Sequence, residues 1–308
     1  MAVLSVHFPQ TEKSLAHALD LLGVVETRMQ SVIQDTSMPL NGVDSIAQQA
    51  ASFHLASGGQ RIRAQLALHA SLTLGIAVDD AVAIAASSEL VHNASLVHDD
   101  LQDRDTTRHG VATVWAAHGD GVAICTGDLL LSAAYCALAG VSQPKLLPAL
   151  MAMLHRCISD ASKGQCADLT SQCPRVVTLQ DYENLAALKS GSLLGLPIEM
   201  ALKCCARESS LALARHAARS FAIGYQIFDD LNDVQRDLSR YTPHPATNAV
   251  AVLQSLDAGV DAPAQARQLA LRHLTIAAQS SELLPRGSGE RLQLLARNLS
   301  ARIIALHP

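Results

Sequence analysis

Two aspartate clusters, far apart in the chain, each end an apolar segment with helical periodicity. Residues 99–103 read D-D-L-Q-D and residues 229–233 read D-D-L-N-D. Because positions four apart share one face of a helix, the first and last aspartates of each cluster point the same way. Carboxylates in apolar surroundings repel one another and need cations. The pattern therefore predicts helices whose acidic faces bind hard divalent cations, which favour oxygen ligands and commonly bridge carboxylates to phosphates. A diphosphate is the substrate that this pattern favours.

The remainder of the chain favours helix throughout. Its 308 residues are 49% hydrophobic but only 3% aromatic, Ala and Leu abound, and strand-type alternation is hard to find. Length alone would suggest about two domains. We nevertheless expect a single domain over residues 1–308, since no linker or break in composition interrupts the chain. Many long helices with an inward-facing carboxylate site describe an all-α helix bundle.

Helical patterns recur with short breaks. Helices are expected over residues 11–34, 43–56, 61–74, 79–103, 120–139, 145–161, 179–189, 192–205, 211–233, 246–256, 262–279 and 290–306. Prolines and glycines predict turns at residues 241–245 and 285–289.

Charge and composition exclude several classes of protein. A net charge of −5 and a pI near 6.2 argue against binding to nucleic acid, which normally requires a basic face. The seven cysteines form no C-x-x-C pair and are expected to be reduced thiols of a cytoplasmic protein. The N-terminus lacks a signal-peptide pattern. The most apolar stretch, residues 122–141, contains Asp128 and is expected to be a buried helix, with no integral membrane segment.

Several ordered motifs resemble one family. Residues 89–103, followed by Arg108-His109-Gly110, resemble the first aspartate region of trans-isoprenyl diphosphate synthases, the polyprenyl synthetase family. Other landmarks of that family follow in the expected order: Gly58-Gly59-Gln60-Arg61-Ile62-Arg63, Thr126-Gly127-Asp128, Gly164-Gln165 with Asp168, Lys189-Ser190, and Gly224-Tyr225-Gln226-Ile227-Phe228-Asp229-Asp230. The resemblance covers roughly residues 45–235.

This resemblance implies an isoprenoid synthase-type bundle around a central cavity, usually a homodimer, with three Mg2+ ions. The implied metal-binding residues are Asp99, Asp100, Asp103, Asp229 and Asp233. The implied catalytic residues are Asp99, Asp103, Asp229, Lys189 and Arg108. The implied substrate-binding residues are Gln60, Arg63, His92, Arg108, His109, Lys189, Ser190 and Gln226. In the reaction that the resemblance implies, metals and cations stabilise departing pyrophosphate, isopentenyl diphosphate attacks the allylic cation that remains, and the new cation then loses a proton to pyrophosphate.

The chain departs from the family where the acceptor diphosphate would bind. Where the family has three cationic residues, this chain has Gln60, Arg63 and His109, and only Arg63 is permanently charged. The family's histidine at position 92 is retained. Charge-assisted contacts contribute about 1.5–3 kcal/mol each, so losing two weakens binding of isopentenyl diphosphate. The change is consistent with a slower synthase, with a different acceptor, or with none.

A second departure follows Asp233. The family usually carries a G-K-x-x-G-x-D segment there, whereas residues 234–243 read V-Q-R-D-L-S-R-Y-T-P. Arg236 or Arg240 could supply a substitute cation.

Product length in this family depends on side chains below the first aspartates. Here these residues are Val91, Ala94 and Ser95, and none is aromatic. We therefore expect room for a chain of C20 or longer.

Two other interpretations stay open beside a prenyltransferase that uses isopentenyl diphosphate. One is an enzyme that ionises an allylic diphosphate but has another acceptor, either a terpene cyclase-like enzyme or one that couples two allylic diphosphates. Against a cyclase, the second cluster is D-D-x-x-D and not the N-S-E type. The other is a silent partner subunit, which would not need both intact aspartate clusters with Lys189 and Arg108.

Overall fold

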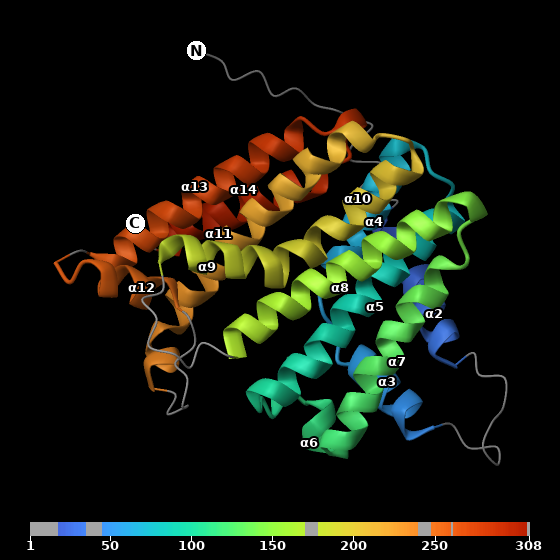
Figure 1. Cartoon of the computed structure of the whole chain (residues 1–308), viewed down its shortest axis with the longest axis horizontal. Helices are drawn as coiled ribbons and strands as arrows, with labels where there is room; N and C mark the ends of the chain where they lie inside the picture. The colour runs from blue at the N-terminus through green and yellow to red at the C-terminus, as the bar shows by residue number, and fades with distance from the viewer. Residues whose placement is uncertain (1–17, 35–44, 170–177, 240–247, 260, 307–308) are drawn as a thin grey trace. The chain divides into compact units, whose positions relative to one another are not determined.

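The computed structural model describes residues 18–34, 45–169, 178–239, 248–259 and 261–306. Helices make up nearly all of it (Figure 1), which confirms the all-α fold class. Its contacts divide into two compact units, residues 1–152 and residues 153–308, and each is described by itself. The single domain expected from the sequence stays a prediction.

The first unit contains six helices of the described chain and a small hairpin, and α8 begins in it. The elements are α2 (Leu22–Gln34), α3 (Ile46–Ala56), α4 (Ile62–Leu74), α5 (Val78–Asp103), β1 (Thr107–Arg108), β2 (Val111–Ala112), α6 (Val114–His118), α7 (Asp120–Leu138), a 3-10 turn (Pro144–Leu146) and the start of α8 (Leu147–Leu169).

Helix α5 forms the core of the first unit, packed between α4 and α7. Its middle is buried on every side and rich in small residues, so neighbouring helices approach closely. The buried carboxylate of Asp80 near its start accepts hydrogen bonds from the amide and hydroxyl of Ser142, at 2.7 and 2.8 Å. This contact ties the segment after α7 to the beginning of α5.

Local signals in the sequence explain the limits of α3 and α4. Ser45 and Gln48 form a reciprocal capping box at the start of α3. Helix α4 ends at Gly75, whose φ of 86° lies in the left-handed region that favours glycine.

The second unit is built around α11. Its elements are the rest of α8, α9 (Leu179–Ala186), a π-helical turn (Ala187–Gly191), α10 (Ser192–Cys204), a 3-10 turn (Glu208–Ser210), α11 (Leu211–Ser239), α12 (Ala249–Leu256), α13 (Ala262–Glu282), a 3-10 turn (Pro285–Gly287) and α14 (Glu290–Leu306).

Close packing of α11 against α13 depends on a glycine. A Cβ atom at Gly224 would lie 2.7 Å from Cγ of Leu274, which is far inside van der Waals contact. The absence of a side chain at Gly224 therefore sets the separation of the two helices just before the second aspartate cluster.

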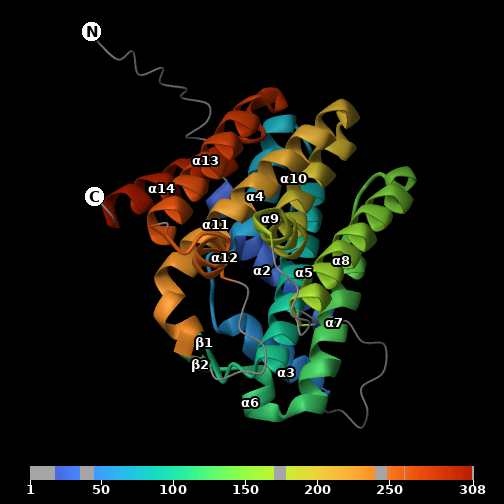
Figure 2. The ribbon, with the colours of Figure 1, turned by 60° about the vertical axis from the view of Figure 1, so that its left-hand side comes forward.

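Three features differ from the expectation. Helix α8 continues to Leu169 instead of stopping near residue 161, and α11 continues to Ser239 instead of residue 233. In α8, the close approach of Gly164 to Lys189 holds the helix together despite the weak helix propensity of glycine. The β1–β2 hairpin and α6 were not anticipated (Figure 2). The proline-rich turn at residues 241–245 lies outside the described residues.

Two helical stretches among the described residues are long and apolar enough to span a membrane by length and composition. They are Asp120–Leu138 and Leu179–Cys204, with 44% and 67% of their apolar windows buried in the fold. A buried core helix passes the same test.

Candidate active-site residues in the two units

The first aspartate cluster occupies the end of α5, and its three carboxylates differ in surroundings. Asp100 is buried, Asp99 is half-buried and Asp103 is exposed. The Arg108 guanidinium holds Asp100 in a bidentate ion pair, with Nη2 at 2.7 Å from Oδ1 and Nε at 2.9 and 3.1 Å from the two oxygens. Burial raises the pKa of Asp100, and the hydrogen bonds and charge of Arg108 oppose that shift. Asp100, expected to be a metal ligand, thus has Arg108 as its partner in the structure.

His109, at a position where the family has arginine, lies in a two-residue turn. Arg108 and Val111 pair across the antiparallel hairpin, with His109 and Gly110 between them. Both turn residues have positive φ, at 52° and 79°, as a type I′ hairpin requires. The turn leaves the His109 side chain exposed to solvent.

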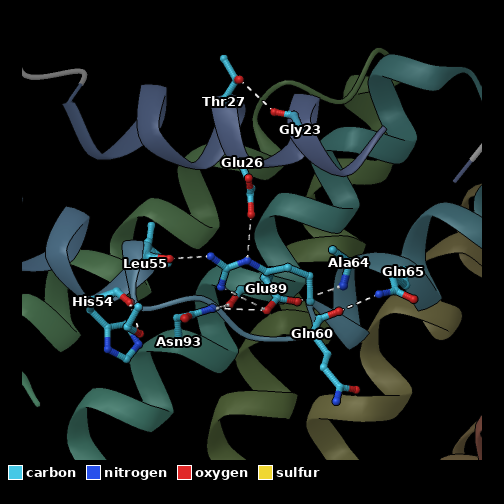
Figure 3. Close-up of polar contacts among 12 residues, drawn as sticks. Gly23, Glu26, Thr27, His54, Leu55, Gln60, Ala64, Gln65, Glu89 and Asn93 are labelled. Carbon is cyan, nitrogen blue, oxygen red and sulfur yellow. Dashed lines mark hydrogen bonds and ion pairs between the residues drawn. The ribbon is translucent and has the colours of Figure 1, made fainter. Parts of the chain in front are cut away.

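The glycine-rich loop between α3 and α4 has an unusual backbone. Gly58, Gly59 and Arg61 all have positive φ, and Gln60 is exposed. Arg61 does not replace the missing lysine charge at position 60, because its guanidinium points into the protein. Figure 3 shows the Gln60 side chain of this loop pointing away from Glu26 and Leu55.

Two neutral histidines lie near the loop. Burial lowers the pKa of His54 to about 4, and the charge of Arg108 contributes. Burial also lowers the pKa of His92 well below its usual value, assisted by Arg63 and Arg108. Nδ1 of His92 is buried and has no hydrogen-bond partner among the described residues. Cationic surroundings with an unsatisfied ring nitrogen are suited to an anionic ligand.

The second aspartate cluster lies on α11 and repeats the first in one respect. Asp230 is buried and Asp229 is half-buried. The Asp230 carboxylate accepts hydrogen bonds from Tyr182 Oη at 2.7 Å, Gln226 Nε2 at 3.0 Å and the Ala249 amide at 2.7 Å. Burial, followed by the charge of Asp230, raises the pKa of Tyr182 strongly, so the phenol stays protonated. Asp233 is within α11, but its side chain is outside the described part.

Lys189 and Ser190 belong to the π-helical turn between α9 and α10. Such turns are rare and often occur at functional sites. The Lys189 ammonium lies 3.2 Å from Oδ2 of Asp168 on α8. A Cβ at Gly164 would lie 2.7 Å from the Lys189 amide nitrogen, so only glycine lets α8 approach this turn. The Gly164, Asp168 and Lys189 motifs of the sequence therefore meet within one unit.

The residues expected to set chain length lie on α5. Val91 and Ala94 are buried, and Ser95 is half-buried. The Ser95 hydroxyl donates to the carbonyl of His92 at 2.7 Å, so it is engaged by its own helix.

A comparison with models of known families identifies this arrangement. Residues 44–242 match the polyprenyl synthetase model, which is more than half of the chain. The chain belongs to the polyprenyl synthetase family. This confirms the resemblance inferred from the motifs.

Curated relatives in this family are prenyl diphosphate synthases. The chain is 34% identical over 182 residues to the geranylgeranyl diphosphate synthase of Mycobacterium tuberculosis, covering 59% of the chain and 52% of the relative. It is 31% identical over 243 residues to the (2E,6E)-farnesyl diphosphate synthase of Mycobacterium bovis, covering 72% and 64%. The alignments therefore span about half to two thirds of the length of these relatives.

Solved structures with the same fold include other polyprenyl synthetases. The geranylgeranyl pyrophosphate synthetase of Geoglobus acetivorans aligns with a TM-score of 0.76 at 22% identity, over 92% of this chain and 99% of that one. The geranyltranstransferase of Thermotoga maritima aligns with a TM-score of 0.76 at 20% identity, over 94% and 99%. These alignments support the isoprenoid synthase fold.

The carboxylates suit Mg2+ only if substrate supplies further ligands. Within the described residues, no group of 3 or more His, Cys, Asp or Glu is arranged to hold a metal ion. Mg2+ typically binds proteins through one or two carboxylates and completes its shell with phosphate oxygens and water. Asp99 and Asp103, two hard oxygen donors on one face of α5, fit that role.

Sequence reasoning missed several residues that shape these sites. Tyr182 supports Asp230, while Glu89 and Arg61 support the glycine-rich loop. Glu89 left a signal, because an acid inside an otherwise apolar run of α5 is costly to bury unless it has a partner. Tyr182 left none, since its partner is 48 positions away in the chain.

Proposed function

We propose that this protein is a Mg2+-dependent trans-prenyltransferase that joins an allylic prenyl diphosphate to isopentenyl diphosphate. The main support for the proposal is an arrangement that the two aspartate clusters of this polyprenyl synthetase family member share. In each, the second aspartate is buried and bound by protein donors, whereas the first is less buried.

Asp99 and Asp103, together with Asp229 and Asp233, are the proposed ligands of three Mg2+ ions. Bound Mg2+ would neutralise the substrate diphosphate and stabilise the leaving pyrophosphate. Asp100 serves differently, since its ion pair fixes the direction of the Arg108 guanidinium.

Arg108, Lys189 and Ser190 are the proposed contacts of the allylic diphosphate. Lys189 is set by its π-helical turn and by Asp168, so its ammonium is placed before substrate arrives. Gln226 donates its amide to Asp230, and we assign it the role of holding that carboxylate as well as contacting substrate.

Val91, Ala94 and Ser95 are the proposed lining for the growing chain. Their modest size supports a product of C20 or longer, and the apolar surroundings exclude water from the allylic cation. Relatives named geranylgeranyl, farnesyl and geranylfarnesyl diphosphate synthases support the same substrate class. A homodimer and a cytoplasmic location stay predictions.

Gln60, Arg63, His92 and His109 are the proposed acceptor contacts. Gln60 and His109 are exposed and lack the permanent charge that the family places there. This favours, as a second candidate function, ionisation of the allylic diphosphate with another acceptor, as in coupling two allylic diphosphates or in terpene cyclase-like chemistry.

One experiment separates the candidates. The pure protein is incubated with Mg2+ and a C10, C15 or C20 allylic diphosphate, with and without isopentenyl diphosphate, and products are identified by mass spectrometry. Longer diphosphates that form only with isopentenyl diphosphate would support elongation and give the product length. Pyrophosphate release without elongation would favour the second candidate, and no release with any substrate would contradict both.

A further inference from the structure

The Arg61 side chain, in the glycine-rich loop, is largely buried and contacts three neighbouring helices. It is only 9% exposed. Nη2 donates to the Leu55 carbonyl at the end of α3, at 2.7 Å. Nε lies 3.3 Å from the exposed carboxylate of Glu26, and Nη1 lies 4.0 Å from the buried carboxylate of Glu89. One guanidinium therefore contacts α2, α3 and α5.

Glu89 is the only one of these acids that is buried, at 3% exposure. Its Oε2 accepts the Ala64 amide in the first turn of α4, at 3.0 Å, and its Oε1 lies 3.4 Å from Nδ2 of Asn93. A buried carboxylate without a cation is strongly unfavourable. Glu89 and Arg61 therefore lower the cost of burying each other's charge, together with the other partners of each.

Together these contacts fix both ends of the loop. Leu55 holds the chain where it leaves α3, and Ala64 holds it where it enters α4. Between them, Gly58 and Gly59 adopt backbone conformations with positive φ that side chains rarely allow. Such a segment has many alternative conformations, so its shape depends on the side chains that hold its ends.

We infer that Glu89 and Arg61 are positioning residues that place the acceptor loop, residues 58–63, for isopentenyl diphosphate. The inference rests on the proposed function. Neither residue contacts the acceptor; both act through the positions of Gln60 and Arg63. With only one permanent cation left among the expected acceptor contacts of the loop, binding depends more heavily on that placement.

The test compares steady-state constants of Glu89→Gln, Arg61→Met and Arg61→Lys with wild type. We expect the first two to raise the KM for isopentenyl diphosphate about tenfold or more, with the allylic KM within about twofold, since losing a charge-assisted contact misplaces only this loop. Arg61→Lys should recover part of the loss. Glu282→Gln and Arg297→Met, which remove an exposed ion pair on α13 and α14, are matched controls with wild-type constants.

Hydrogen exchange provides a second measurement that does not require turnover. In Glu89→Gln the Ala64 amide should exchange faster, while amides in the middle of α5 keep their protection. Equal changes in both KM values with a general loss of protection would mean a purely structural role and overturn the inference. An unchanged KM for isopentenyl diphosphate would overturn it as well. If wild type fails to elongate, the proposed function fails, and calorimetric binding of isopentenyl diphosphate to wild type and Glu89→Gln then decides the inference alone.

Discussion

The phenol of Tyr182 on α9 donates a 2.7 Å hydrogen bond to the buried carboxylate of Asp230 on α11. Arg108 makes the equivalent contact with Asp100 in the other unit. In both clusters the second aspartate is therefore held by protein donors. These contacts fix the helix that carries the other aspartates of the cluster.

Removing the Tyr182 hydroxyl should weaken the second unit. Tyr182→Phe leaves a buried carboxylate with one donor fewer, and we expect a loss of about 1–3 kcal/mol in the free energy of unfolding. Urea denaturation measures it. A double-mutant cycle with Asp230→Asn isolates the pair. Strictly additive effects of the two substitutions would contradict the contact.

Substitutions in the first aspartate cluster should affect activity at two positions and stability at the third. Asp99→Ala combined with Asp103→Ala should abolish Mg2+-dependent pyrophosphate release while the melting temperature stays near wild type, because neither side chain is fully buried. Asp100→Asn should lower the melting temperature, because it leaves Arg108 without its buried counterion. Retained activity in the double variant would exclude these residues as metal ligands.

Restoring family charges should strengthen acceptor binding. Gln60→Lys with His109→Arg adds two cations at exposed positions of the loop and hairpin. We expect the KM for isopentenyl diphosphate to fall at least about tenfold, since each charge-assisted contact contributes about 1.5–3 kcal/mol. Initial rates at saturating allylic diphosphate provide the measurement. An unchanged KM would show that the substituted positions do not face the acceptor.

Stability should fall in mild acid because His54 is buried in its neutral form. Its pKa is lowered from 6.5 to about 4, so the unfolded chain binds the proton more tightly. The stabilisation is complete above pH 6.5 and is lost as pH falls toward 4, by up to about 1.4 kcal/mol per pH unit. His92 acts in the same direction. In His54→Gln the urea midpoint should change less with pH across this range. The same change with pH as in wild type would contradict the assignment.

Glycine at position 164 should be required for the Lys189 turn. Gly164→Ala places a methyl group 2.7 Å from the Lys189 amide nitrogen, and we expect a loss of about 1–3 kcal/mol together with lower activity. Gly121→Ala in α7 is the matched control, because nothing lies within 4 Å of its Cβ. That control should be neutral or slightly stabilising. Equal melting temperatures for the two variants would argue against close packing at Gly164.

Composition and patterning predicted most of the helices, and the ordered motifs identified the family. The helix-favouring composition of α4 and α5 is a local property, and the ordered motifs between residues 45 and 235 are read directly from the chain. Residue type and spacing identified Asp99 and Asp103 as candidate metal ligands, whereas Lys189 was identified only through the family resemblance.

Only the tertiary structure decided how deeply each of those residues is buried and which groups surround it. Asp99 and Asp100 are identical in the sequence, yet burial beside Arg108 makes one of them a structural counterion. Glu89 and Arg61, 28 positions apart, become partners only when α5 packs beneath the glycine-rich loop. The physical reason is desolvation: the cost of burying a charge depends on its neighbours in space, and one-dimensional spacing does not contain that information.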